Sequence, residues 1–170
     1  VDADVWEAAR ALTGWSIVLY NGNGGASYAT IALSGLIPDQ CGGTGTVSVA
    51  QSGIQNGNPD GFALVNSSNQ VVEFLSYGGT FAAANGPAAG LTSTDIGVTE
   101  SSTGAAGRSL QRDNDGWFGP VTASFGACIL PAMRSRRHRI HRARTTDPGA
   151  HYAASAHVVR PARSVRQPVI

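Results

Sequence analysis

In the first 128 residues, the side chains that could take part in catalysis are carboxylates, because this part of the chain contains no lysine and no histidine. That composition excludes a Ser-His-Asp or Cys-His unit, a lysine nucleophile and a histidine-based metal site within it. A glycosidase-like pair of acids would have to come from five carboxylates, and nothing in their spacing selects two. The five are Asp39, Asp60, Glu73, Asp95 and Glu100. We expect them to be solvated carboxylates of loops and edges.

The run 113–116, Asp-Asn-Asp-Gly, resembles part of a calcium loop. A full EF-hand loop needs a third ligand and a distal glutamate at fixed spacing, and the sequence lacks both. Asp113 and Asp115 are therefore weak calcium candidates, and a plain turn is the preferred interpretation because Asp, Asn and Gly are turn residues. A second polar cluster is expected to bond backbone groups of its own loop, with calcium binding as the minor alternative. It consists of Asn56, Asn58 and Asp60.

Four aromatic residues could line a groove. For Trp15 and Phe74 we prefer a place in the core, because aromatic residues flanked by aliphatic ones on strands are usually packed. Tyr77 lies at the end of an expected strand and is the better surface candidate. Tyr20 is the fourth member of the set.

A basic run at 134–144 is the remaining group of residues with evident chemistry. It can bind nucleic acid or an anionic membrane, and its affinity would then fall steeply with salt. It contains no interleaved aromatic residue and no recognition motif, so it implies no sequence specificity. Its six arginines are Arg134, Arg136, Arg137, Arg139, Arg142 and Arg144.

The net charge of +1 is a sum over two unlike parts of the 170-residue chain. Residues 1–128 hold ten acids and three arginines, a net charge of −7, whereas residues 129–170 hold nine arginines and one acid, a net charge of +8. The second part has too few large apolar residues to form a core, so we expect disorder. Its Arg/His/Pro-rich composition is also that of GC-rich DNA translated out of frame. A genuine basic tail and a frameshift product therefore both stand as interpretations.

The elements expected to position these residues are short β-strands. Gly- and Asn-rich turns separate them, and no amphipathic stretch between them could form a crossover helix, which favours an antiparallel sandwich or barrel over a parallel sheet. The loop 66–70 predicts a hairpin, the long connection 81–107 is expected to cross between sheets, and 1–12 has the spacing of a short helix. The expected strands are 15–20, 28–33, 46–49, 62–65, 71–75, 108–111 and 121–125.

A series of motifs in a fixed order resembles the lamin tail domain, in the branch found in secreted bacterial proteins. The resemblance covers roughly 12–128 and opens on Leu-Thr-Gly-Trp-Ser-Ile-Val-Leu-Tyr-Asn-Gly at 12–22. It implies an immunoglobulin-like antiparallel β-sandwich of about 100 residues. Such domains resemble accessory modules, often joined to nucleases of the endonuclease/exonuclease/phosphatase type, and bring no catalytic residues of their own. The other matching segments are 30–35, 54–57, 59–65, 72–77, 86–90, 95–98 and 108–111.

The resemblance divides the chain into a non-family segment 1–11, a β-sandwich 12–128 and the tail 129–170. Because the context is then secreted or cell-surface, Cys41 and Cys128 are expected to form a disulfide rather than two free thiols. No run of 18 apolar residues predicts a transmembrane helix, and no signal peptide opens the chain. Since the sequence begins with Val1, we expect a fragment or a processed product.

We therefore expect a non-catalytic module without cofactor or metal that binds or positions a partner. The partner would be a missing catalytic domain, such as a nuclease, or another protein. The alternative is a nucleic-acid-binding protein that uses the arginine-rich tail.

Overall fold

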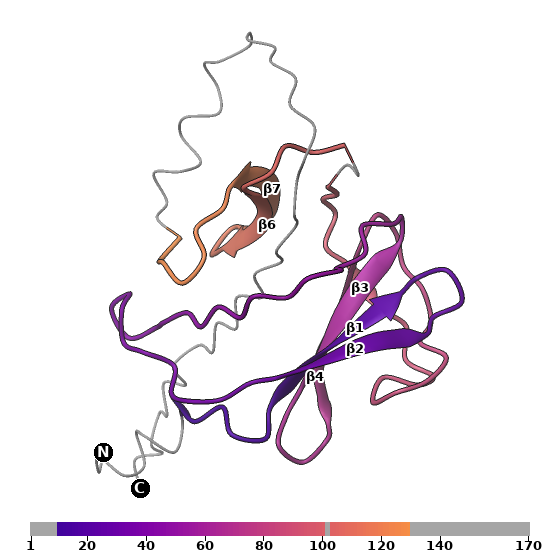
Figure 1. Cartoon of the computed structure of the whole chain (residues 1–170), viewed down its shortest axis with the longest axis horizontal. Helices are drawn as coiled ribbons and strands as arrows, with labels where there is room; N and C mark the ends of the chain where they lie inside the picture. The colour runs from indigo at the N-terminus through magenta and orange to yellow at the C-terminus, as the bar shows by residue number, and fades with distance from the viewer. Residues whose placement is uncertain (1–9, 101–102, 130–170) are drawn as a thin grey trace, which may run out of the picture.

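The computed structural model describes residues 10–100 and 103–129 (Figure 1). Seven strands form a five-stranded sheet in the order β2-β1-β3-β4-β5 and a separate two-stranded sheet, the β6–β7 ribbon. The strands are β1 (Ser16–Asn21), β2 (Ser27–Ala32), β3 (Asp60–Val65), β4 (Val71–Tyr77), β5 (Thr94–Asp95), β6 (Arg108–Asp113) and β7 (Gly116–Thr122). The expected all-β, sandwich-like architecture is confirmed. The larger sheet is mixed rather than purely antiparallel, because β5 pairs parallel to β4.

The two faces of the larger sheet each bury a separate apolar cluster, as the alternation of side chains along a strand requires. On one face, Tyr20 and Phe74 lie with their ring centroids 5.2 Å apart, and Phe74 meets Phe81 edge-on at 5.3 Å. On the other face, Leu19 packs in a cluster that includes Trp15. The predicted core positions of Trp15 and Phe74 are thereby confirmed.

The turn between β1 and β2 depends on glycine at one position. Gly25 has a φ of +69°, and a Cβ atom there would lie 2.1 Å from the carbonyl oxygen of Ala82. The Gly-rich run after β1 therefore both reverses the chain and lets the 82–84 segment approach closely. Asn21 closes this turn by donating its backbone N–H to the carbonyl of Ala26 at 2.9 Å.

Two of the sequence-based strand predictions are wrong. Residues 46–49 join no sheet, because Thr46 donates its backbone N–H to the side chain of Gln40 instead of to a neighbouring strand. The predicted strand at 121–125 is replaced by β7, which runs from Gly116 to Thr122. The two-residue turn at 114–115 makes this strand begin at Gly116 and sets its register against β6. The hairpin at 66–70 is confirmed between β3 and β4.

The ends of the chain lie mainly outside the described residues. The predicted helix at 1–12 is testable only at its last positions, where Arg10 is helical and Ala11 forms a bridge with Leu36. The predicted disorder of the tail and its six arginines at 134–144 fall outside the described part. The connection 81–107 does run from the larger sheet to the β6–β7 ribbon, as expected, and contributes β5 on the way.

The predicted disulfide is present. Cys41 and Cys128 are bonded with their Cα atoms 5.9 Å apart, which is within the range that native disulfides adopt. The bond joins the loop after Ile37 to the segment that follows β7. Within the described residues, no helix is long and apolar enough to cross a membrane.

Candidate functional site

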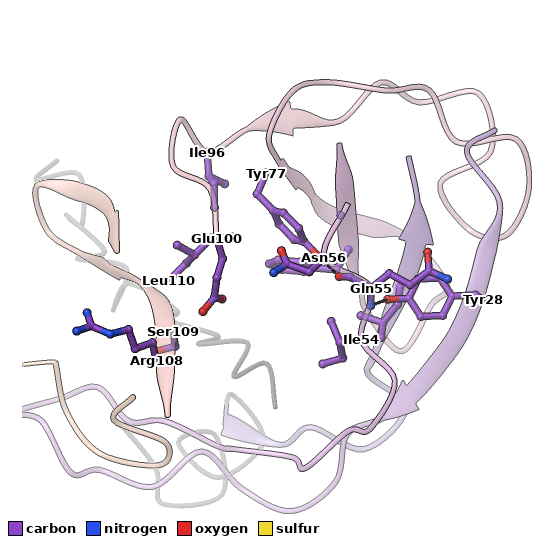
Figure 2. Close-up of a pocket in the computed structure, with 13 residues that line it drawn as sticks. Tyr28, Ile54, Gln55, Asn56, Tyr77, Ile96, Glu100, Arg108, Ser109 and Leu110 are labelled. Atoms are coloured by element: carbon purple, nitrogen blue, oxygen red, sulfur yellow. Dashed lines mark hydrogen bonds between the residues drawn. The ribbon is translucent and has the colours of Figure 1, made fainter. Parts of the chain in front are cut away.

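A cleft lies between the larger sheet and the β6–β7 ribbon (Figure 2). No Cα atom of the ribbon lies within 8 Å of a Cα atom in a strand of the larger sheet, and the loop residues 54–56 and the 96–100 segment also line the space between the two layers. Its volume of about 100 Å³ holds several water molecules or one small ligand. It is lined by Leu19, Tyr28, Ile54, Gln55, Asn56, Gly61, Phe62, Tyr77, Ile96, Glu100, Arg108, Ser109 and Leu110.

Two tyrosines fix one wall of this cleft through the backbone of Gln55. The hydroxyl of Tyr77 donates to the carbonyl of Gln55 at 2.6 Å, and the N–H of Gln55 donates to the hydroxyl of Tyr28 at 3.0 Å. Both backbone groups of one loop residue are thus satisfied by rings that come from two different strands, β4 and β2. Tyr77, the better surface candidate among the four aromatic residues, does line the cleft, with a half-buried side chain.

The pKa values of both tyrosines are raised above 10. Burial raises the pKa of Tyr77, and the charges of Asp60 and Glu100 add to the effect. Burial also raises the pKa of Tyr28, partly offset by the hydrogen bond from Gln55. Both hydroxyls therefore stay protonated at neutral pH and keep their donor capacity.

Asn56 and Glu100 each bring a buried polar atom without a hydrogen-bond partner into the cleft. Among the described residues, no group pairs with Nδ2 of Asn56 or with Oε1 of Glu100. Figure 2 shows the two side chains entering from opposite sides. Both atoms are closed off from solvent, and leaving a buried donor or acceptor unpaired costs free energy, so a small side-chain rotation that opens them to water or a ligand is favoured.

Asp60, at the start of β3, holds the loop that carries Asn56. Its side chain is almost fully buried, and its two carboxylate oxygens accept the backbone N–H groups of Gly22 at 2.9 Å and Gly57 at 2.5 Å. The expectation that this cluster bonds its own loop is confirmed for the contact with Gly57. The contact with Gly22 reaches across 38 residues to the turn after β1.

The other acidic candidates lie in separate places. Asp39 and Asp95 each accept a backbone N–H within their own loops, from Gly43 at 2.8 Å and from Gly97 at 3.0 Å. Glu73 forms an exposed ion pair with Arg112 at 3.1 Å. Of the five carboxylates considered, Glu100 alone lines the cleft.

Asp113 and Asp115 lie at the turn between β6 and β7, so the predicted turn is confirmed, while their role as weak calcium candidates stays a prediction. A carboxylate oxygen of Asp113 accepts the backbone N–H of Asp115 at 2.9 Å, and Asp113 pairs with Gly116 across the turn. Residues 10–100 and 103–129 contain no cluster of three side chains suited to holding a metal ion.

Tyr28, Gln55 and Ser109 are cleft residues that the sequence did not indicate. Tyr28 looks like an ordinary strand residue, and Gln55 lies in the matching segment 54–57, to which the resemblance assigns no functional role. The one available signal was the Asn- and Gly-rich composition of 53–60, which marks a loop held by its own side chains rather than a hairpin turn.

The chain matches no family model, and no curated protein or solved structure matches it. The lamin-tail resemblance therefore stays a prediction that rests on the motifs quoted above. The disulfide, the two sheets and the cleft stand independently of it.

The raised pKa of Glu100 predicts a pH dependence of stability. Burial raises this pKa above its ordinary value of 4.5, and the nearby charge of Arg108 partly opposes the shift. The folded state then holds the proton more tightly than the unfolded chain does. The resulting stabilisation is complete below the unfolded pKa and is lost as pH rises through the folded pKa.

We expect the Glu100→Gln variant not to show this loss of stability with rising pH. Urea midpoints measured from about pH 4 to about pH 7 should fall with rising pH less in the variant than in the wild type. The variant should consequently gain relative stability at the upper end of the range. Parallel midpoint curves for the two proteins would contradict the assignment.

Proposed function

We propose that residues 12–128 form a non-catalytic binding and positioning module of a secreted or cell-surface protein, accessory to an extracellular nuclease. The cleft between the two sheets carries the binding part of the proposal, because two of its lining residues hold buried polar atoms that have no partner within the described part of the chain. The disulfide supports an oxidising, extracellular location, since such bonds rarely persist in the cytosol. The nuclease connection rests on the resemblance to lamin tail domains.

The arrangement of the acids supports a non-catalytic role. A glycosidase-like mechanism needs two carboxylates facing one substrate, and the cleft is lined by one, Glu100. Asp60 is close enough to raise the pKa of Tyr77, but both of its oxygens are engaged by backbone N–H groups. It is therefore a structural carboxylate and cannot serve as the second member of a pair.

The test is a turnover assay on the purified full chain. We expect no cleavage of single- or double-stranded DNA, of RNA or of an aryl phosphate ester, with or without added Mg²⁺ or Ca²⁺. A Glu100→Gln variant provides the control, because it alters the one acid that lines the cleft. Hydrolysis by the wild type that this variant lacks would overturn the non-catalytic assignment.

The nucleic-acid-binding alternative is favoured by one observation, the nine arginines against a single acid in 129–170. It predicts that replacing the six arginines of 134–144 by serine lowers the slope of log affinity against log salt by roughly 5 for duplex DNA. Filter binding of both full-length proteins across a salt series decides the matter. Under our preferred proposal the two proteins bind DNA equally weakly.

A further inference from the structure

We propose that the cleft between the larger sheet and the β6–β7 ribbon binds a neutral, hydroxyl-bearing ligand, namely a single sugar residue of a glycan. This inference deepens the proposed function by naming the ligand class of the same module, and it rests on that function. Three properties of the cleft support it: its unpaired polar atoms, its aromatic walls and its balance of charge.

The unpaired atoms call for a group that accepts and donates at the same time. Nδ2 of Asn56 is a donor, and Oε1 of Glu100 is an acceptor when the carboxyl group is ionised. Once the side chain turns toward the cavity, a hydroxyl satisfies either atom, and adjacent hydroxyls of one sugar ring can satisfy both. An aliphatic ligand would leave the two atoms unpaired and would bind at a cost.

Tyr28 adds a third polar contact of the same kind. Its hydroxyl oxygen accepts the N–H of Gln55, so its own proton is available to a ligand oxygen. The hydroxyl of Tyr77 has the opposite arrangement, since its proton goes to the carbonyl of Gln55 and its oxygen can accept. The cleft thus offers donors and acceptors in alternation, which suits a polyol better than a carboxylate or an amine.

The walls of the cleft are largely apolar. Rings from β2, β3 and β4 meet aliphatic side chains from the 96–100 segment and from β6, and these residues are Tyr28, Phe62, Tyr77, Ile96 and Leu110. A sugar ring combines C–H faces that pack against such side chains with hydroxyls directed outward. Apolar walls with a few placed polar groups are the usual composition of a small-molecule site.

The charges around the cleft disfavour an ionic ligand. An anion would meet the carboxylate of Glu100 and the field of Asp60, whose charges add to burial in raising the pKa of Tyr77. A cation would meet Arg108, whose charge lies close enough to Glu100 to lower its pKa. Neither sign of ligand charge is favoured, so a neutral ligand incurs the smallest electrostatic penalty.

The polar groups are held in place before any ligand arrives. Tyr28 and Tyr77 fix the backbone of Gln55, and Asp60 fixes Gly57, so Asn56 is anchored on both sides along the chain. A preformed site avoids the entropic cost of ordering a loop on binding. This rigidity makes binding of a single ring measurable despite the small contact area.

The experiment is a titration of the ¹⁵N-labelled full chain, followed by NMR, with glucose, galactose, mannose and N-acetylglucosamine at up to roughly 50 mM. We expect at least one sugar to shift the side-chain amide signal of Asn56 and the backbone signals of 54–57, with an affinity in the millimolar range. Asn56→Leu and Glu100→Gln should each weaken this binding about tenfold. Glu73→Gln, a matched change in an exposed ion pair away from the cleft, should leave it unchanged.

Three results would overturn the proposal. The first is the absence of shifts with all four sugars, which would mean that water alone occupies the cleft. The second is sugar binding that both variants retain. The third is a set of shifts produced by butylammonium or acetate but by none of the sugars. The backbone spectra of the variants show directly whether they are folded. Sugar binding can fail while the turnover assay remains negative, so failure of this inference is distinguishable from failure of the proposed function.

Discussion

Reduction of the disulfide between Cys41 and Cys128 should lower the free energy of unfolding by about 4–5 kcal/mol on chain-entropy grounds. The bond spans 87 positions of sequence, so its loss restores a large number of conformations to the unfolded chain. A domain of ordinary size has only about 5–15 kcal/mol of stability, so this single bond provides much of the total. Urea unfolding with and without dithiothreitol measures the change.

Reduction of the disulfide should destabilise some parts of the fold more than others. No backbone contact joins the β6–β7 ribbon to the larger sheet within 8 Å. Besides the disulfide, the ribbon side is tied by the exposed ion pair between Arg112 and Glu73 and by the exposed hydrogen bond from Nε2 of Gln40 to the carbonyl of Gly126 at 3.4 Å. Both contribute little because solvent reaches them. Hydrogen exchange of the reduced protein should therefore speed up more in β6 and β7 than in the central strands β1 and β3.

A double variant, Cys41→Ala with Cys128→Ala, controls for other effects of the reductant. Its urea midpoint should match that of the reduced wild type and should not change when dithiothreitol is added. An unfolding free energy that is the same before and after reduction would show that the bond contributes nothing. Equal exchange rates throughout the reduced protein would instead contradict the separate release of the ribbon.

The strands were largely predictable because their signals are local. The apolar runs of β1 and β4 and the loop between β3 and β4 appear within windows of a few residues. The prediction failed at 46–49, where alternation is present but no neighbouring strand is, and Gln40 takes the N–H of Thr46 instead. Alternation indicates a half-buried extended segment, and it does not reveal whether another strand lies alongside.

The cleft was not predictable in the same way, since it depends on contacts between distant residues. Tyr28 and Gln55 are 27 positions apart, and Asn56 and Glu100 are brought together only when the 81–107 connection crosses between the sheets. The sequence identified Glu100 as one of five equivalent acids. Its place in the wall of the cleft is what distinguishes it, and that place is a property of the assembled layers.

Replacement of Asp60 by alanine should destabilise the fold by about 3–5 kcal/mol. Two backbone N–H groups, of Gly22 and Gly57, would lose a carboxylate acceptor, and hydrogen bonds to charged groups contribute about 1.5–3 kcal/mol each. The site is almost fully buried, so water cannot readily replace the lost acceptor. Chemical denaturation of the two proteins in parallel measures the difference.

Asp95→Ala is the matched control, because Asp95 also accepts a backbone N–H, from Gly97, but is exposed to solvent. Water can take over the exposed bond, so this variant should lose less than about 1 kcal/mol. Equal losses in the two variants would show that the burial of Asp60 does not matter. Asp60→Asn should fall between them, because an amide keeps one acceptor oxygen but turns an N–H group toward the second backbone donor.

The Asp60→Asn variant also separates stability from binding. The hydrogen-bonding route from Asp60 to the cleft runs through Gly57, whose N–H fixes the loop next to Asn56. If the variant is folded under the conditions of the sugar titration, its affinity should fall because the donor of Asn56 is no longer held in position. An affinity equal to that of the wild type would show that the turn after β1, and not the cleft, is what this buried carboxylate holds together.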